Sequence, residues 1–183
     1  MLAAWRMLKE PLPLKIVGDG PMAPLVRDAA AADPRIEWLG RRPLKDVYQV
    51  MGDATMLVFP SRCYETFGRV AVEAFAKGTP VIASAHGAMK DVVSDDRTGL
   101  LFEPGNAAAL VDCVRRLLSD PGRLQTMRRT AREEYLAKYT GERNHQLLIG
   151  AYERARATVL QPVRIIPSPA RLEKTCTEKA PVA

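Results

Sequence analysis

Two glutamates in the middle of the chain, Glu65 and Glu73, stand eight positions apart. They follow an apolar run at residues 56–59 that stops at Pro60, and the second glutamate lies in a helical pattern that Gly78 ends. This succession predicts a strand, a loop and a helix that opens at a binding surface. If both glutamates lay along one helix axis, their eight positions would cover about 12 Å at 1.5 Å per residue.

The separation of the two carboxylates favours binding over hydrolysis. The two carboxyl groups of a glycoside hydrolase stand roughly 5 to 9.5 Å apart, and this pair lies at or beyond that limit. A nucleotide-sugar fits better, because its pyrophosphate could bind the backbone N–H groups from Thr66 to Arg69, where the helix dipole favours negative charge. Each hydroxyl-rich end of the ligand would then meet one carboxylate. The alternative is an amphipathic helix with a solvated Glu73 and with Glu65 as its N-cap.

The residues around the pair form a longer pattern. Pro60-Ser61 comes before Glu65, Phe67-Gly68 lies between the two glutamates, and Ala76-Lys77-Gly78-Thr79-Pro80-Val81-Ile82-Ala83 follows them. Over roughly residues 1–157 the chain resembles the retaining glycosyltransferases of family four. The resemblance implies a nucleotide-diphosphate-sugar donor and a fold of two Rossmann-like lobes, of which this chain would be the C-terminal, donor-binding lobe.

The resemblance also implies roles for individual residues. Glu65 would contact the donor sugar and is the candidate catalytic residue, whereas Glu73 would bind the ribose hydroxyls. The backbone between them would hold the sugar and the diphosphate, which makes the donor-binding positions Glu65, Thr66, Phe67, Gly68, Arg69 and Glu73. The family generally needs no metal, and no His, Cys and Asp grouping has metal-ligand spacing. We therefore expect neither a metal nor a cofactor.

The rest of the chain alternates strand and helix patterns, which predicts an α/β protein. The expected strands are residues 14–17, 36–39, 56–59, 81–83 and 99–102, and the expected helices are residues 2–9, 21–32, 43–52 and 88–94. C-terminal helices follow at 106–119, 123–138 and 142–159. Strands separated by helices indicate a doubly wound, Rossmann-like parallel sheet with helices on both faces.

In such sheets ligands bind outside the carboxyl ends of the strands. Gly18, Gly20 and Gly40 fall in loops at those ends, and the resemblance places the first two in the donor cleft and the third near the nucleotide base. For each glycine a purely structural role, as the turn between a strand and a helix, is equally open. His86 lies in a further loop of this kind, and we interpret it as a loop or capping histidine rather than a catalytic base.

Composition and charge limit the partners. The contents of 47% hydrophobic and 26% charged residues are those of a soluble globular domain. The net charge of +6 suits an anionic ligand. Because basic and aromatic residues are not interleaved, we expect no nucleic-acid partner.

The expected location is cytoplasmic. Three cysteines lie far apart without a Cys-x-x-Cys pair, which indicates a reducing compartment, and no run approaches 18 apolar residues. The arginines Arg128, Arg129 and Arg132 form one basic helix face, which we interpret as solvated. Its alternative role is peripheral contact with the inner face of an anionic membrane.

The resemblance does not cover the amino-terminal part of a complete enzyme of the family. A complete enzyme of this kind has a second lobe for the sugar, lipid or polysaccharide acceptor, and its donor lobe starts with a strand that would lie before Met1. In the usual doubly wound order that strand is central, so its loss would leave two neighbours with unpaired backbone groups beside an apolar gap.

We therefore expect an N-terminally truncated fragment. In it, residues 1–159 would form the donor-binding lobe, and the proline-rich residues 160–183 would form a disordered tail. A non-catalytic nucleotide-binding module, or a subunit that a partner chain completes, is the alternative.

Overall fold

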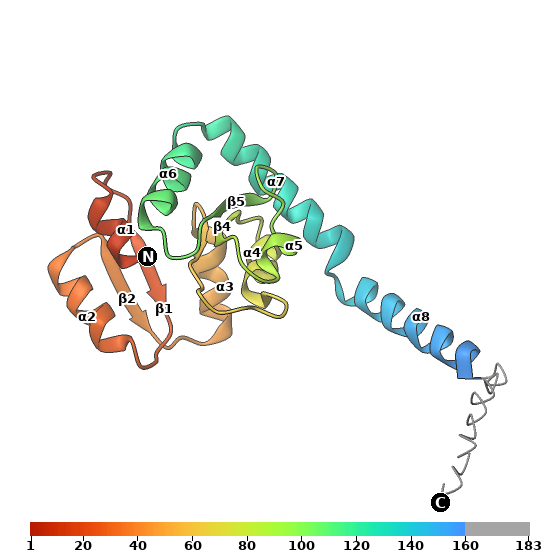
Figure 1. Cartoon of the computed structure of the whole chain (residues 1–183). Coiled ribbons are helices and arrows are strands. Elements are labelled where there is room, and N and C mark those ends of the chain that lie inside the picture. The colour runs from red at the N-terminus through yellow and green to blue at the C-terminus, as the bar shows by residue number, and fades with distance from the viewer. Residues whose placement is uncertain (160–183) are drawn as a thin grey trace, which may run out of the picture. The chain divides into compact units, whose positions relative to one another are not determined.

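The computed structural model describes residues 1–159, in which strands and helices alternate as the sequence predicts (Figure 1). The strands are β1 (Leu14–Val17), β2 (Ile36–Gly40), β3 (Leu57–Phe59), β4 (Val81–Ser84) and β5 (Gly99–Phe102). The helices are α1 (Leu2–Met7), α2 (Ala23–Ala32), α3 (Leu44–Asp53), α4 (Arg69–Ala76), α5 (Met89–Val92), α6 (Ala107–Leu118), α7 (Pro121–Lys138) and α8 (Gly141–Val159). The expected tail at 160–183 lies outside the described residues.

The described strands all lie in one compact unit, Met1–Asn144, and a second unit begins at His145 within α8. The candidate residues from Gly18 to Glu73 lie in the first unit as well. None of the helices found over residues 1–159 is long and apolar enough to cross a membrane.

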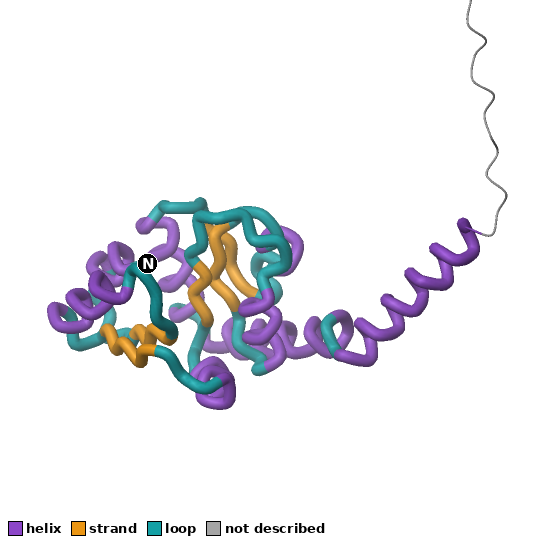
Figure 2. The backbone as a smooth tube through the Cα atoms, turned by 90° about the horizontal axis from the view of Figure 1, so that it is seen from below, coloured by secondary structure: helices purple, strands orange, loops and turns teal. Residues whose placement is uncertain are grey.

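Every strand pair is parallel, but the strands form two sheets rather than one (Figure 2). The first sheet contains β1 and β2, and the second has the order β3-β4-β5. Over the described residues no ladder of hydrogen bonds joins the two sheets. The parallel α/β architecture is confirmed, and its strands are divided between a sheet of β1 and β2 and a sheet of β3, β4 and β5.

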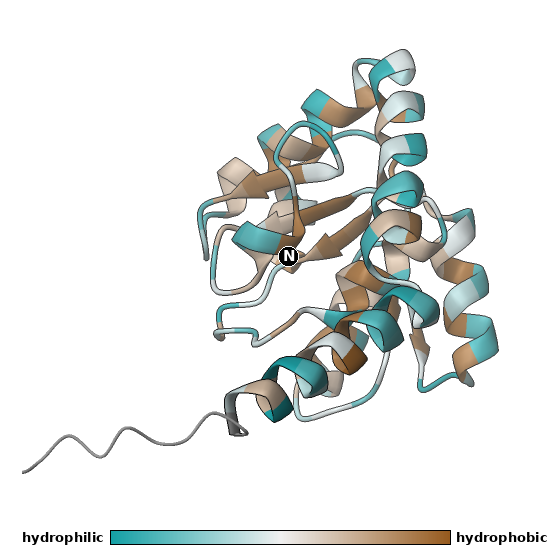
Figure 3. Cartoon of the chain, turned by 90° about the vertical axis from the view of Figure 1, so that its right-hand side faces the viewer, coloured by the Kyte–Doolittle hydropathy of each residue, from teal (hydrophilic) through white to brown (hydrophobic). Residues whose placement is uncertain are grey.

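Helices cover both faces of the second sheet, whose strands Figure 3 shows as hydrophobic ribbons between helices. Ile82 faces a core that also contains α1 and α6, whereas Val81 and Ala83 face a core built with α4 and α5. All four residues of β4 are buried, as expected for the middle strand of a parallel sheet. Helix α7 contributes Met127 to the first core and Ala131 to the second.

The first sheet is less deeply buried than the second. Leu14 and Ile36 join the core of α1 and α6, but Lys15 and Glu37, which stand opposite each other in register, are exposed. Opposite charges on a cross-strand pair stabilise a sheet only modestly. The first sheet therefore depends on further contacts with its helices.

Arg35, just before β2, donates hydrogen bonds to α1 and to the residues that follow it. Its guanidinium donates hydrogen bonds to the carbonyl oxygens of Trp5 at 2.7 Å, Leu8 at 2.7 Å and Glu10 at 2.9 Å. The carboxylate of Asp33 holds the same guanidinium at 2.7 Å, and this hydrogen bond lowers the pKa of Asp33. One arginine thus satisfies carbonyls at the end of α1, which have no partner within the helix.

The predicted basic face on α7 is not a row of solvated arginines. Arg128 donates to the carbonyl oxygens of Ala54 at 2.7 Å and Gly52 at 3.1 Å, and Arg132 donates to the carbonyl oxygen of Ala76. These two side chains fasten α7 to the ends of α3 and α4. The solvated interpretation was wrong for Arg128, which is half-buried, because carbonyls at helix ends attract cations, whereas Arg132 is exposed while it makes its contact.

Candidate functional site

The loop between β3 and α4 carries most of the predicted site residues, and Gly68 is its last residue before α4. The φ of Gly68, +77°, lies in the left-handed region, and a Cβ at this position would overlap the terminal methyl group of buried Met89. A side chain is disfavoured here on both counts. The glycine allows α4 to start at Arg69 directly above the core.

Helix α4 presents an uncapped amino-terminal end. Its N-cap residue is Gly68, and no side-chain hydrogen bond from the described residues caps the helix. The first hydrogen bonds of the helix run from the N–H groups of Ala71 and Val72 to the carbonyl of Gly68, at 3.0 and 3.4 Å. The N–H groups of Arg69 and Val70 come too early in the helix to have an acceptor within it. Together with the helix dipole they form a surface that favours an anion.

Glu65 lies in the loop and not in α4, which corrects the spacing estimate. Its carbonyl accepts a hydrogen bond from the N–H of Ala88 at 3.1 Å, so the loops after β3 and β4 touch. Only residues 69–73 of the interval between the two glutamates are helical, so the axial separation of about 12 Å does not apply. The N-cap of α4 is Gly68, and the alternative role of Glu65 as that cap was wrong.

Glu73 is held in place on the first turns of α4. Its side chain is 17% exposed, and its carboxylate pairs with Nε of Arg69 at 3.0 Å. The hydroxyl of Tyr48 on α3 donates to the same carboxylate at 3.4 Å. A solvated Glu73 is therefore excluded. Sequence reasoning missed Tyr48, because the contact joins residues 25 positions apart and nothing in the local pattern marks it.

Thr66 and Phe67 lie in the bend before α4, so the helix starts later than the predicted run of amides. Phe67 is 50% exposed and meets Tyr139 edge to face, with ring centroids 6.2 Å apart. Tyr64, which is 80% exposed, stacks on His86 with centroids 3.8 Å apart. The contact agrees with the interpretation of His86 as a loop residue, and it leaves an aromatic rim beside Glu65.

The three glycines of the first sheet occupy turns. Gly18 and Gly40 have positive φ values, +128° and +64°, at the carboxyl ends of β1 and β2. The N–H of Gly18 donates to the carbonyl of Gly40 at 2.8 Å, and the indole of Trp38 donates to the carbonyl of Gly18 at 3.0 Å. Gly20 precedes α2 and has open space around it. Their turn role is clear, and their contact with a ligand stays a prediction.

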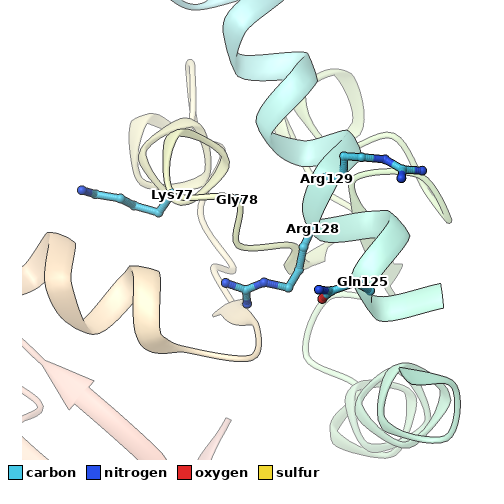
Figure 4. A pocket seen from close by; sticks show the side chains of 5 residues that line it. All are labelled: Lys77, Gly78, Gln125, Arg128 and Arg129. Atoms are coloured by element: carbon cyan, nitrogen blue, oxygen red, sulfur yellow. The ribbon is translucent and has the colours of Figure 1, made fainter. Parts of the chain in front are cut away.

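An open pocket lies away from these residues, lined by Lys77, Gly78, Gln125, Arg128 and Arg129 (Figure 4). Lys77 and Gly78 follow the carboxyl end of α4, whereas the candidate residues precede or begin that helix. The dipole at a helix carboxyl end disfavours anions. This pocket is therefore distinct from the candidate site.

The candidate site combines a positive helix end with a carboxylate on either side of it in the sequence. The amides of α4 and the guanidinium of Arg69 suit a diphosphate, and Glu65 and Glu73 are acceptors for hydroxyl groups. Within the described residues no group of three His, Cys, Asp or Glu side chains could hold a metal ion. The arrangement is chemically suited to an anion with hydroxyl-rich ends.

Sequence comparison identifies the family to which this architecture belongs. The family model described as glycosyl transferases group 1 matches residues 1–120, which is well over half of the 183 residues. The chain belongs to the glycosyl transferases group 1 family. All five described strands and the loop before α4 lie within the matched region.

Individual relatives agree with this assignment. The 2-deoxystreptamine glucosyltransferase of Streptomyces kanamyceticus is 34% identical over 143 residues, which cover 76% of this chain and 36% of that protein. Sucrose-phosphate synthase from Thermosynechococcus elongatus superposes with a TM-score of 0.75 at 31% identity, over 86% of this chain and 41% of that one. HepE from Anabaena, in complex with UDP, gives a TM-score of 0.75 at 22% identity, over 83% and 44%. This chain thus spans less than half of each protein.

Proposed function

We propose that this chain is the donor-binding half of a retaining glycosyltransferase. It would bind a nucleotide-diphosphate sugar, and the sugar would pass to an acceptor held by a second lobe. The observation that carries the proposal is the uncapped amino-terminal end of α4, with Glu65 before it and Glu73 within it. HepE, whose fold is similar, has been crystallised with UDP and with UDP-glucose, which supports a nucleotide-sugar as the ligand.

The diphosphate would lie on the amides of Arg69 and Val70, where the helix dipole and the Arg69 guanidinium stabilise its charge. As the bond to the sugar breaks, negative charge on the departing diphosphate grows, so the same groups would stabilise the transition state. Glu65 would orient the sugar at the loop. Catalysis would come from positioning and electrostatics.

Glu73 would accept hydrogen bonds from the ribose hydroxyls. Tyr48 and Arg69 already fix its carboxylate at 3.4 and 3.0 Å, so little side-chain entropy is left to lose when the ribose binds. We expect Glu73→Ala to weaken donor affinity by roughly 1 to 3 kcal/mol, because charge-assisted hydrogen bonds are lost.

The experiment is thermal unfolding of the chain with and without millimolar UDP, GDP or ADP. A ligand at about 100 times its dissociation constant adds roughly 2.7 kcal/mol of stability, which raises the unfolding midpoint. We expect one nucleotide to raise the midpoint of the wild-type chain and to have little effect on Glu73→Ala. The nucleotide that raises the midpoint also identifies the base that the site binds.

Glu133→Ala is the matched control. Glu133 on α7 is a glutamate in the same kind of intrahelical pair, with Arg129 four positions earlier at 3.7 Å, and it is 64% exposed. Its variant should respond to the nucleotide as the wild type does. Equal shifts in the wild type, Glu73→Ala and Glu133→Ala would remove Glu73 from the donor site.

A non-catalytic nucleotide-binding module is the second candidate, because the uncapped amino-terminal end of α4 suits a nucleotide diphosphate whether or not a transfer follows. A measurement of donor turnover distinguishes the enzyme from the non-catalytic module. Hydrolysis or transfer of the donor that disappears in Glu65→Ala supports the enzyme, whereas nucleotide binding without turnover supports the module or a subunit completed by a partner. The acceptor, a cytoplasmic location and peripheral membrane contact stay predictions.

A further inference from the structure

Three charged residues share one face of α4. Arg69, Glu73 and Lys77 stand four positions apart, so they follow one another along the helix surface. Nε of Arg69 lies 3.0 Å from the Glu73 carboxylate. Lys77, the C-cap residue of α4, is exposed, and Figure 4 shows its side chain extending away from Arg128 and Arg129. Glu73 thus lies between two basic residues on this face.

Tyr48 of α3 lies against the same face. It is half-buried, and its hydroxyl donates to the Glu73 carboxylate at 3.4 Å. Nζ of Lys77 lies over its ring, 5.4 Å from the ring centroid, and an ammonium group is attracted to the face of an aromatic ring. The tyrosine therefore contacts two consecutive turns of α4, and the contact on its ring helps to direct its hydroxyl at Glu73.

The two partners of Glu73 differ in how far a donor would disturb them. The Arg69 side chain is 78% exposed, and an exposed ion pair of this spacing contributes little and is screened by salt. Arg69 also lies at the amino-terminal end of α4, where the proposed diphosphate would bind. A guanidinium binds phosphate oxygens in pairs, and a diphosphate carries more negative charge than one carboxylate. The diphosphate should therefore draw Arg69 away from Glu73.

Tyr48 should keep its place when the diphosphate binds, because a hydroxyl group is not attracted to a diphosphate as a guanidinium is. An ionised carboxylate has about four acceptor sites, so a hydrogen bond from Tyr48 leaves sites for the ribose hydroxyls. Without a partner the Glu73 side chain would regain rotamers, and ribose binding would have to restrict them again. The hydroxyl of Tyr48 is thus suited to hold Glu73 in the complex.

We propose that Tyr48 is a positioning residue of the donor site: its hydroxyl holds the Glu73 carboxylate for the ribose hydroxyls while Arg69 moves from Glu73 to the diphosphate. This inference rests on the proposed function, which places the ribose at Glu73. It assigns to α3 a part in distinguishing ribose from deoxyribose.

The test measures how strongly the chain prefers a ribonucleotide. Isothermal titration calorimetry gives the dissociation constants of UDP, GDP and ADP and of their 2′,3′-dideoxy counterparts for the wild type and for Tyr48→Phe. The variant removes the hydroxyl and keeps the ring under Lys77. We expect the wild type to prefer one ribonucleotide by about tenfold, because its hydroxyls bind a charged acceptor.

In Tyr48→Phe that preference should fall by about threefold or more, because Glu73 must be ordered again on binding. The dissociation constant of the dideoxy counterpart should change by less than about twofold, since this ligand has no ribose hydroxyls for a carboxylate to accept from. A purely structural role of Tyr48 would instead weaken both ligands equally, and that result would overturn the proposal.

Two variants serve as controls. Tyr135→Phe removes the hydroxyl of another half-buried tyrosine, on α7, that also has a cation over its ring, Arg132 at 5.3 Å. It should keep the wild-type preference. Glu73→Ala should lose the preference altogether, which would link the preference to the carboxylate.

Arg69→Ala tests the exchange of partners. It should weaken the ribonucleotide and its dideoxy counterpart equally, since the diphosphate loses a cation while Tyr48 still holds Glu73. Tyr48→Phe should then reduce the preference by the same factor in the Arg69→Ala background as in the wild type. A larger reduction in that background would mean that Arg69 still holds Glu73 in the complex, which contradicts the proposal.

The remaining outcomes separate this inference from the proposed function. A preference that disappears in Glu73→Ala but is intact in Tyr48→Phe rules out the role of Tyr48 and leaves the donor site in place. A preference that Tyr48→Phe and Tyr135→Phe reduce alike also rules it out. A preference that Glu73→Ala leaves unchanged overturns both the inference and the placement of the ribose at Glu73.

Discussion

The two sheets share one alternation of strand and helix but are stabilised differently. Around β3–β5 the contacts are mainly apolar: β4 is buried throughout, and Phe75 and Val81 are fully buried in the core beside it. Around β1 and β2 the sheet is half-exposed, and hydrogen bonds from Arg35, Trp5 and Trp38 to carbonyl oxygens join its parts.

The difference follows from which strands have neighbours on both sides. A strand flanked on both sides can bury its side chains and its backbone together, and its stability then scales with apolar area. A two-stranded sheet buries little, so polar side chains must satisfy the carbonyls that its helices leave unpaired. Mutations that leave cavities should therefore destabilise the second sheet most, and mutations that remove hydrogen bonds should destabilise the first.

Phe75→Ala tests the apolar side of the comparison and should have the largest effect. Phe75 on α4 is fully buried, and truncation of a buried phenylalanine costs about 3 to 5 kcal/mol through lost transfer energy and a residual cavity. Urea unfolding followed by circular dichroism measures the loss. Val70→Ala on the same helix, at a side chain 38% exposed, should change stability little; equal losses would contradict the assignment of the core.

Arg35→Ala tests the polar side and should come second. The variant leaves the carbonyls of Trp5, Leu8 and Glu10 without their donor, and we expect the thermal midpoint to fall by roughly 4 to 8 °C. Arg27→Ala is the control, because Arg27 lies over the ring of Trp38 at 5.1 Å but donates to none of these carbonyls. A midpoint unchanged in Arg35→Ala would show that the first sheet does not depend on these bonds.

Gly68→Ala joins stability to the candidate site. A non-glycine residue in the left-handed region costs about 1 to 2 kcal/mol, and the terminal methyl group of Met89 must move to make room for the new Cβ. We expect both a lower midpoint and a smaller nucleotide-induced shift. Gly122→Ala, in the first turn of α7, keeps ordinary φ values and should be neutral or slightly stabilising. If the nucleotide raised the midpoint of Gly68→Ala as much as that of the wild type, the loop would not be needed for nucleotide binding.

Glu10→Gln should have the smallest effect, and it should depend on pH. The hydrogen bond from Arg115, at 2.7 Å, lowers the pKa of Glu10 from its ordinary 4.5 to about 2. A depressed folded-state pKa contributes stability that is complete above the ordinary value and is lost as pH falls through the folded value. The midpoints of wild type and variant should differ slightly at pH 6 and converge between pH 4.5 and 2. A difference that persists at pH 2 would exclude this pair as the cause.

The order of elements was predictable because each strand is a short apolar run and each helix has its own period. The separation into two sheets agrees with the expectation that two neighbouring strands lack a partner between them. What the sequence did not show was the contact of Arg35 with α1, or of Arg128 with Gly52 and Ala54. Long side chains reach carbonyls that only the tertiary fold brings near.

At the candidate site, the residue types were predictable and their geometry was not. The glutamates and Gly68 stand in a recognisable pattern, yet the start of α4 at Arg69 depends on the left-handed turn of Gly68 over Met89. Glu65 therefore lies in the loop before the N-cap Gly68 rather than at the cap itself. The packing of Tyr48 against Glu73 and of Tyr64 against His86 joins segments whose sequences give no sign of each other.

The placement of the two tryptophans has a spectroscopic consequence. Trp5 and Trp38 are the only tryptophans of the chain. Trp38 lies on β2 and Trp5 lies on α1, in the core that α1 shares with α6 and β4, and each indole N–H donates to a carbonyl oxygen. Intrinsic fluorescence therefore reports on the first sheet and on that core, whereas far-ultraviolet ellipticity is dominated by the longer helices α6, α7 and α8. If the fluorescence transition precedes the ellipticity transition, the surroundings of the two indoles open before the long helices unfold, and the chain does not unfold as a two-state system.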